Sequence, residues 1–214
     1  MFDYVIRIMP FLLEGLWTTA KVYVVTIIFA IPLAVLAAIG KVAGPKILKG
    51  VLGIYTWAWR GTPLLLQLFI VVFGLPVIGI RLPLFVAAVL VYVLNMAAYI
   101  TEIMRAAIQS VDKGQYEAAK VLGMSYWQTM FRIILPQSIR MALPPTCSEA
   151  INLVKDTALL TTISMHDLLR AAKLIATRDY SIVAYIIAFM LYLIISSVFV
   201  KLFGELEKKA AYYD

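Results

Sequence analysis

Residues 16–40 read LWTTAKVYVVTIIFAIPLAVLAAIG, and this stretch decides the fold class. Lys21 is its only charged residue, and a helix of about 20 apolar residues is long enough to cross a bilayer. Its many valines and isoleucines would favour a strand in water. Lipid offers no partner for free backbone N–H and C=O groups, however, so a spanning segment must be helical. The stretch therefore predicts a transmembrane helix.

The composition of the whole chain supports a membrane protein. Hydrophobic residues make up 63% of the 214 residues and charged residues 14%, whereas soluble domains have about 45–50% and 25%. The net charge of +7 comes from basic residues spread singly between apolar runs, which fits membrane headgroups better than nucleic acid. A chain of this length has room for five or six spans and for no sizeable soluble domain.

The apolar runs predict an all-α membrane protein with five transmembrane helices in one domain over residues 1–214. After 16–40, the other predicted spans are 55–75, 83–107, 142–163 and 181–203. The side with more Lys and Arg should face the cytoplasm. Most basic residues lie on the cytoplasmic side if the loop 41–54, the loop 108–141 and the C-terminus are placed inside. The N-terminus is then outside. The basic residues on the cytoplasmic side are Lys41, Lys46, Lys49, Lys113, Lys120, Arg132, Arg140, Lys201, Lys208 and Lys209, with Arg60 and Arg105 near the boundary.

The segment 164–179, SMHDLLRAAKLIATRD, is too polar to span. Leu168, Leu169, Ala172 and Ile175 share one face, so it is expected to form a helix lying at the outer membrane interface. Two roles stay open for it: contact with an external binding protein, or a connector that caps the bundle.

The polar loop 111–140 predicts a helical hairpin. Residues 115–124 contain helix formers, and Gly123 is suited to end that helix because glycine accepts the left-handed conformation. Ser125 can cap a second helix over residues 126–134 through its hydroxyl, and Pro136 is expected to block simple continuation. The residues alone leave open whether this hairpin docks a partner or only connects two spans.

The spacing within this loop carries a family resemblance. Glu117-Ala118-Ala119 is followed after three residues by Gly123, and after nine more by Ile133-x-Leu135-Pro136. The pattern resembles the EAA loop of ABC importer permeases of the type I fold. The resemblance implies that the loop is a cytoplasmic coupling helix that seats in a groove of an ATP-hydrolysing subunit. Its ATPase-coupling residues would be Glu117, Ala118, Ala119, Gly123 and Pro136.

Further motifs resemble the polar amino acid permeases of that family, of the histidine, glutamine and arginine type. They are Arg60-Gly-Thr-Pro-Leu-x-x-Gln67, Tyr99-x-x-Glu102-x-x-Arg105, and Lys155-Asp-Thr-Ala-Leu159, in which Ala158 replaces a more usual Ser. The resemblance implies the plasma (inner) membrane of a prokaryote. It also implies a pair of permease subunits, identical or homologous, two ATP-binding subunits and an external solute-binding protein.

The sequence contains no catalytic constellation. No glycine-rich phosphate loop with a lysine and no histidine or cysteine cluster for a metal occurs in it. The chain is therefore not expected to be an enzyme or to hold a cofactor, and ATP with Mg²⁺ would be bound by the partner subunit. An ion-driven secondary transporter is the less favoured alternative, because it would be expected to show an internal repeat.

Polar residues inside predicted spans are costly and mark functional sites by default. Glu149, Asn152 and Asp156 are spaced i, i+3, i+7, and Asn95, Tyr99 and Glu102 are spaced i, i+4, i+7, so each set follows one helical stripe. With Gln67 on the second span they are the predicted substrate-binding residues. Pro144 and Pro145 are expected to break or kink their helix and free carbonyls near Glu149.

The charges suggest a ligand. Glu149 has no basic partner within one turn, so we expect it, with Asp156, to receive the cationic group of arginine, lysine or histidine. An ion pair to another span, or a protonated carboxyl, is the open alternative, and glutamine or another polar amino acid is the alternative substrate. Glu102 and Arg105 can pair at i, i+3. Arg60 is expected at the inner end of its span, in a structural role.

Overall fold

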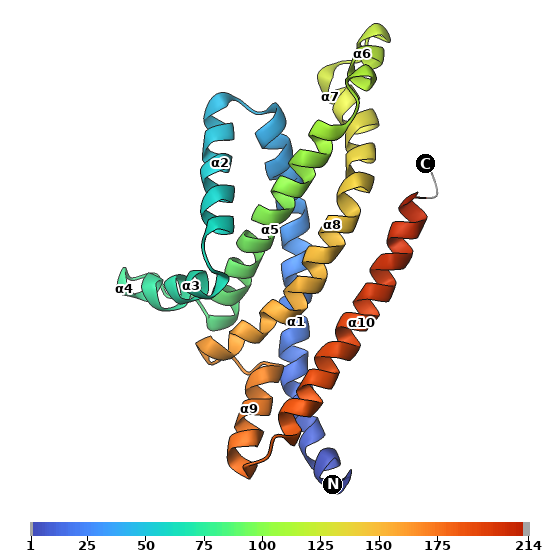
Figure 1. The fold of residues 1–214 in the computed structure, drawn as a ribbon. Helices are drawn as coiled ribbons and strands as arrows, with labels where there is room; N and C mark the ends of the chain where they lie inside the picture. Colours follow the sequence, from blue (N-terminus) through green and yellow to red (C-terminus); the bar gives the residue numbers. More distant parts are fainter. Residues whose placement is uncertain (1, 212–214) are drawn as a thin grey trace.

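The computed structural model describes residues 2–211, and every regular element in that range is a helix (Figure 1). The long helices are α1 (Phe2–Ala43), α2 (Lys46–Gly61), α5 (Leu84–Ser110), α8 (Leu135–Asp156) and α10 (Val183–Ala211). The shorter ones are α3 (Leu64–Phe69), α4 (Leu75–Val77), α6 (Lys113–Val121), α7 (Tyr126–Thr129) and α9 (Leu168–Asp179). Two π-helical turns, η1 (Ile70–Gly74) and η2 (Met130–Ile134), and a 3₁₀ segment, η3 (Thr157–Ile163), complete the order.

The centre of the bundle is the contact between α1 and α5. Small buried residues of both helices belong to one core cluster here, namely Ala30 and Ala34 on α1 and Ala88 and Ala97 on α5. Small side chains let two backbones approach closely. In lipid this close packing drives helix association, because the lipid tails are as apolar as the side chains and the hydrophobic effect does not favour contact between helices. The hydroxyl of Thr101, on α5, donates a hydrogen bond to the carbonyl of Ala97 at 2.6 Å. The α1–α5 pair thus forms a rigid centre on which the other helices pack.

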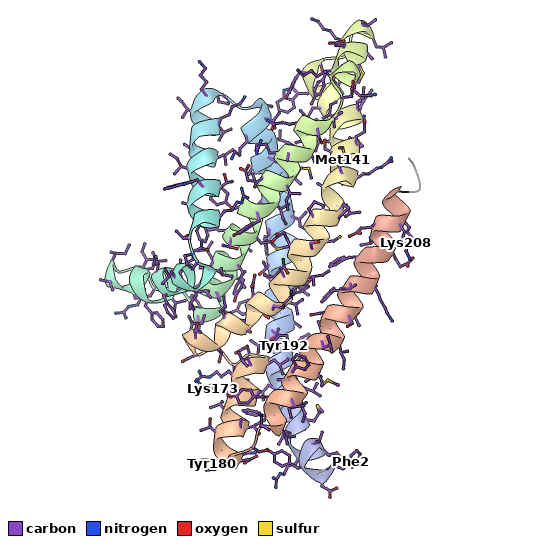
Figure 2. The ribbon with its side chains drawn as sticks, in the orientation of Figure 1. Phe2, Met141, Lys173, Tyr180, Tyr192 and Lys208 are labelled. Carbon is purple, nitrogen blue, oxygen red and sulfur yellow. The ribbon has the colours of Figure 1, made fainter. Side chains whose placement is uncertain are left out.

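The elements are arranged along one long axis. The N-terminus of α1 and helix α9 lie at one end, whereas α6 and α7 lie at the other (Figure 1). Figure 2 shows Phe2 and Tyr180 at the first end, and Met141 and Lys208 toward the second. Helices α3 and α4 project sideways from the bundle (Figure 1). The hairpin and the α9 segment therefore occupy opposite ends, as the charge pattern predicts for a cytoplasmic and an outer position.

Length and composition identify membrane-crossing helices among the described residues. Three qualify singly, Phe2–Ala43, Leu84–Ser110 and Val183–Lys209, and the pair Lys46–Gly61 with Leu64–Val77 qualifies together. Helix α10 presents a largely apolar exposed surface, with Phe189 65% exposed, which suits lipid as its solvent. Helix α8 does not qualify within residues 2–211, because charged and polar side chains interrupt it. Five spans therefore remain a prediction, and four are the most that this criterion supports.

The second span, predicted over 55–75, is not one continuous helix, and its counterpart in the structure is the bent pair Lys46–Gly61 and Leu64–Val77. The chain bends by 107° between α2 and α3. Thr62 is extended (φ −121°, ψ 147°) because the residue before a proline is excluded from the helical region, and Pro63 follows in an extended conformation. The predicted loop 41–54 is also wrong. Helix α1 continues to Ala43 and α2 begins at Lys46, so only a two-residue connection remains.

The helix is not broken at any of three prolines, which contradicts the break expected at Pro136 and one of the two outcomes, a break or a kink, expected at Pro144 and Pro145. Pro136 is the second residue of α8, yet the π-helical turn η2 directly before it joins α7 to α8 without a loop, so the helix continues past this proline. Pro144 and Pro145 lie inside α8, which continues to Asp156. The carbonyls that these two prolines leave without an i+4 donor belong to residues 140 and 141, which lie about two turns before Glu149 and therefore not near it.

Helix α9 is fastened to α1 at both of its ends. At its start, the Asp167 carboxylate accepts from the backbone N–H groups of Leu169 and Arg170, and the N–H of Leu168 donates to the Thr19 hydroxyl at 3.2 Å. At its far end, the Tyr4 hydroxyl donates to Asp179 at 2.8 Å. The hydrogen bond from Arg178 holds the pKa of Asp179 at about 2, so this carboxylate stays ionised at physiological pH. The amphipathic helix predicted for 164–179 is therefore present, beginning at Leu168.

Gly15 makes the close approach of α1 and α9 possible. A Cβ atom at this position would lie 2.6 Å from the carbonyl oxygen of Asp167 and 2.9 Å from the Cβ of Ala171. Gly15→Ala is therefore expected to push the helices apart and destabilise the protein by about 1–3 kcal/mol, the usual cost of overpacking. Thermal unfolding in detergent measures the change. Gly204→Ala is the matched control, since a Cβ there meets no atom within 4 Å, and equal melting temperatures for both variants would contradict the prediction.

Candidate functional site

A polar cavity of about 480 Å³ lies where the α2–α3 bend meets α5 and α8. Its size is in the range of sites for small molecules. The bend contributes part of the wall, α5 contributes two side chains, and the C-terminal half of α8 contributes the rest. The lining residues are Thr62, Pro63, Leu64, Asn95, Tyr99, Glu149, Asn152, Lys155 and Asp156. Five of the seven residues predicted from the sequence to bind substrate are therefore brought together by the fold.

Helix α8 supplies the charge of the cavity. Glu149, Asn152 and Asp156 line it together, as their helical spacing predicts, and Lys155 lines it as well. The Lys155 ammonium donates to the side-chain oxygen of Asn152 at 3.2 Å and its charge also acts on Asp156. Within residues 2–211 Glu149 takes part in none of the four ion pairs. The predicted alternative of an ion pair between Glu149 and another span is thus not seen.

Tyr99 connects the cavity to Arg60. The guanidinium carbon of Arg60 lies 5.3 Å from the centroid of the Tyr99 ring, and the Tyr99 hydroxyl donates to the carbonyl of Arg60 at 3.4 Å. The charge of Arg60 acts on Glu149. Arg60 was expected at the inner end of its span. It instead closes α2 at the bend, about 21 Å along the helix from Lys46 at a rise of about 1.5 Å per residue, beside the cavity.

The amides of Gln67 and Asn95 hold the bend. Gln67 donates to the carbonyl of Trp59 at 2.8 Å and to the hydroxyl of Thr62 at 2.8 Å. Asn95 donates to the side-chain oxygen of Gln67 at 2.9 Å and to the Trp59 carbonyl at 3.2 Å. Gln67 is buried and does not line the cavity. These hydrogen bonds satisfy carbonyls that the end of a helix leaves free, so both amides support the site through the backbone.

Glu102 lies outside the cavity, in an ion cluster that joins three helices. Its carboxylate accepts from Lys41 on α1, from Thr56 on α2 at 2.9 Å and from Arg105 at 2.8 Å. The pairing with Arg105 predicted from the sequence is confirmed. The side chains of Lys41 and Glu102 are each only 13% exposed, so the carboxylate has no free face for a substrate. The structure gives Glu102 a structural position.

Glu102→Gln is therefore expected to reduce stability and leave ligand preference unchanged. The substitution leaves Lys41 and Arg105 without the carboxylate that they share. The cost should fall between that of an exposed pair and the 3–5 kcal/mol of a fully buried one, at about 2 kcal/mol. Thermal unfolding in detergent, compared with relative uptake of several amino acids, measures both effects. A changed order of preferred amino acids without a drop in melting temperature would contradict this prediction and would indicate that Glu102 contributes to substrate binding.

The hairpin between α5 and α8 forms as predicted. Helix α6 ends at Val121, and Gly123 adopts the left-handed conformation with φ 74°. Ser125 caps α7 in a reciprocal capping box with Gln128, in which the backbone N–H of Gln128 donates to the Ser125 hydroxyl at 3.3 Å. Ala119 is 1% exposed and packs inward, whereas Glu117, Ala118 and Pro136 are exposed.

The tip of this hairpin presents apolar side chains to its surroundings. The rings of Trp127 and Phe131 stack with their centroids 5.8 Å apart. The exposed residues are Val121 (87%), Leu122 (78%), Tyr126 (46%), Trp127 (51%) and Phe131 (58%). Exposed apolar surface of this kind, rimmed by charged residues, is typical of a protein interaction site.

Comparison with known proteins identifies the family of this chain. The family model described as the inner membrane component of binding-protein-dependent transport systems matches residues 30–209. The L-cystine transport permease TcyB of Bacillus subtilis (strain 168) is 40% identical over 87% of this chain and 80% of its own. The arginine transport permease ArtQ of the same organism is 39% identical over 91% of this chain and 92% of its own.

A solved structure matches the whole arrangement. The crystal structure of an amino acid ABC transporter with histidines superposes with a TM-score of 0.90 and 34% identity, over 98% of both chains. A match at this level shows that the two chains share one fold over nearly their whole length. The chain therefore belongs to the family of inner membrane components of binding-protein-dependent transport systems, and it is a permease of the amino acid ABC type.

Proposed function

We propose that this permease imports basic L-amino acids, namely arginine, lysine or histidine, by alternating access driven by ATP. The observation that carries the proposal is the placement of two half-buried carboxylates, Glu149 and Asp156, on the wall of one polar cavity. A carboxylate that is partly removed from water costs free energy unless a cation compensates its charge. Lys155 compensates part of that charge, and a cationic substrate would compensate the rest.

The α6–α7 hairpin, in this proposal, is the coupling helix. Glu117, Ala118, Ala119, Gly123 and Pro136 would shape it for the groove of an ATP-binding subunit, with the apolar tip in the contact. Two such subunits would bind ATP and Mg²⁺, so this chain would need no cofactor of its own. A second permease subunit, identical or homologous, would complete the membrane pathway, and an external binding protein would deliver the amino acid at the α9 end.

The proposed orientation follows from the same arrangement. The chain would cross the prokaryotic inner membrane five times, with its N-terminus and α9 outside and the hairpin and C-terminus in the cytoplasm. The α2–α4 elements would form one bent span, and α8 with η3 another. The α8 stripe would lie at a site that opens to one side at a time, as alternating access requires a bistable helix arrangement.

A ligand screen tests the proposal. The permease is reconstituted with its ATP-binding subunit and external binding protein in proteoliposomes, and uptake of labelled arginine is measured with each other common amino acid as competitor. We expect ATP-dependent uptake that lysine and histidine inhibit most. Uptake of glutamine or cystine that no basic amino acid inhibits would assign the alternative, a neutral polar substrate. Uptake driven by an ion gradient without ATP would overturn the mechanism.

A further inference from the structure

An apolar groove of about 300 Å³ lies between α1 and α10. Its α1 wall extends from Leu13 to Val24, its α10 wall is formed by Ile195 and Phe199, and the buried Val154 of α8 also lines it. The groove shares no lining residue with the polar cavity. It is therefore a separate feature of the molecule, on helices that contribute nothing to the candidate substrate site.

The groove exists because α10 packs only loosely along α1. Of the three described helices that qualify singly as spans, α10 is the least buried, at 11% of its apolar window against 61% in α5. It packs on α8 and α9, and on α1 the Tyr23 ring meets the Phe199 ring with centroids 4.7 Å apart. An unfilled apolar groove forgoes the dispersion contacts that a filling group would supply. Since both helices cross a membrane, lipid acyl chains are the apolar groups that surround it.

The dimensions of the groove suit one acyl chain. Val24 follows Leu13 by 11 residues, so the α1 wall is about 16 Å long at a rise of about 1.5 Å per residue. One leaflet of the hydrocarbon core is about 15 Å thick. An apolar cavity of about 150 Å³ holds benzene, with its six carbons, so twice that volume holds roughly twelve carbons. A helix of a partner protein, about 10–12 Å across with its side chains, is too wide for this space.

Lys21 supplies a charge beside the groove. It lies one turn from both Trp17 and Val24 on α1, so the three share one helix face. Lys21 is exposed, and within residues 2–211 it takes part in no ion pair or hydrogen bond. Glu14, on the same helix, is about 10 Å away along the axis and forms no ion pair with it. An ammonium inside a span is costly unless it reaches a polar partner.

The direction of the Lys21 side chain makes a lipid phosphate that partner. Side chains on a helix point toward its N-terminus, and the N-terminus of α1 lies at the α9 end of the molecule (Figure 1). A lysine stem of four methylene groups can therefore lie along the apolar wall while the ammonium reaches the headgroup level of the bilayer. The groove takes the chain of a lipid, and the ammonium takes its phosphate.

From this arrangement we infer that one membrane phospholipid occupies the α1–α10 groove, with an acyl chain between the two helices and its phosphate on the Lys21 ammonium. The lipid supplies α10 with the contacts along α1 that the protein itself does not make. It sits in the leaflet at the α9 end, which is the outer leaflet in the proposed orientation. This lipid site goes beyond the proposed transport function, and failure of either proposal leaves the other standing.

Photolabelling locates the lipid. A phosphatidylglycerol that carries a diazirine on one acyl chain is incorporated with the purified permease complex into phosphatidylcholine vesicles, irradiated, and traced to peptides by mass spectrometry. We expect several times more label on residues 13–24 and 195–199 than on the surface of α2 around Trp57, which is 76% exposed. Even labelling of all apolar surfaces would overturn the inference. So would a groove without label, as expected if a second permease subunit covers it.

Thermal unfolding tests the phosphate contact. Phosphatidylglycerol is compared with diacylglycerol of the same chains, which lacks the phosphate, on the delipidated permease complex in detergent. We expect phosphatidylglycerol to raise the melting temperature by about 2–4 °C more than diacylglycerol, and Lys21→Gln to remove most of this difference. Because each variant is compared with itself in the two lipids, a general loss of stability does not affect the result.

Two further variants separate the chain from the headgroup. Ala20→Leu places a larger side chain in the groove and should reduce the gain from both lipids together with the photolabel. Lys173→Gln, an exposed cation on α9 outside the groove (Figure 2), is the matched control and should keep the wild-type difference. A lipid difference that survives in Lys21→Gln, or that is lost equally in Lys173→Gln, would overturn the contact between Lys21 and the phosphate.

Discussion

Gly123→Val is expected to lower ATP-dependent uptake at least tenfold while the protein still inserts into the membrane. Gly123 adopts φ 74°, a conformation that costs a residue with a Cβ about 1–2 kcal/mol and a β-branched residue more. The turn it forms is tight, with the N–H of Gly123 donating to the carbonyl of Lys120 and the N–H of Met124 to that of Ala119, each at 3.0 Å. A valine would reopen this turn and displace α7 from α6.

Three measurements separate docking from folding in this variant. Uptake is measured in proteoliposomes, membrane level by immunoblot, and binding of the ATP-binding subunit by co-purification. A Cβ at Gly123 would meet no atom within 4 Å, so the expected loss comes from the backbone and not from a clash. Gly123→Asn should retain most uptake, since asparagine tolerates this conformation. Gly204→Val, in the exposed helix α10, is the second control. Full uptake by Gly123→Val would count against the hairpin as the docking element.

Glu149→Gln is expected to lower arginine uptake at least tenfold. Glutamine keeps the length and hydrogen-bonding reach of the side chain and removes only its charge. A hydrogen bond to a charged group contributes about 1.5–3 kcal/mol, and 1.4 kcal/mol is a factor of ten in affinity. The loss should appear for lysine as well. Uptake of a neutral amino acid, where it is measurable, should change little.

The control for this variant is Glu14→Gln, an exposed carboxylate on α1 that does not line the cavity. Uptake by both variants is compared at several arginine concentrations, so that a change in apparent affinity is distinguished from a change in maximal rate. The expected change is in affinity. Arginine uptake that is unchanged in Glu149→Gln would refute the role of its charge and would favour a protonated carboxyl in the resting protein.

Local features of this fold could be predicted from the sequence. The i, i+3, i+7 spacing of Glu149, Asn152 and Asp156 places them on one stripe in any helix, and the structure shows them on one cavity wall. The turn at Gly123 and the cap at Ser125 are likewise decided within four residues. Such features depend on backbone geometry and on immediate neighbours, which the sequence contains in full.

Features that depend on distant partners could not be predicted in this way. Glu102 follows the same stripe as Asn95 and Tyr99, yet Lys41, 61 residues away, takes its carboxylate. Gln67 was expected on the substrate path, but the bend places its amide against the end of α2. One signal for the bend was present, since a residue before proline rarely stays helical. Applied at Thr62, that rule separates α2 from α3 and moves Arg60 to the cavity.

The unbroken backbone from Ser125 to Asp156 has a mechanical consequence. Helix α7, the π-helical turn η2 and α8 follow one another with no flexible joint, over about 47 Å at a rise of about 1.5 Å per residue. If an ATP-binding subunit displaces the hairpin, as proposed above, the movement therefore reaches Glu149 along one continuous helical segment. ATP hydrolysis without transport of an amino acid should consequently be rare. The ratio of ATP hydrolysed to amino acid transported should stay nearly constant as the transport rate varies.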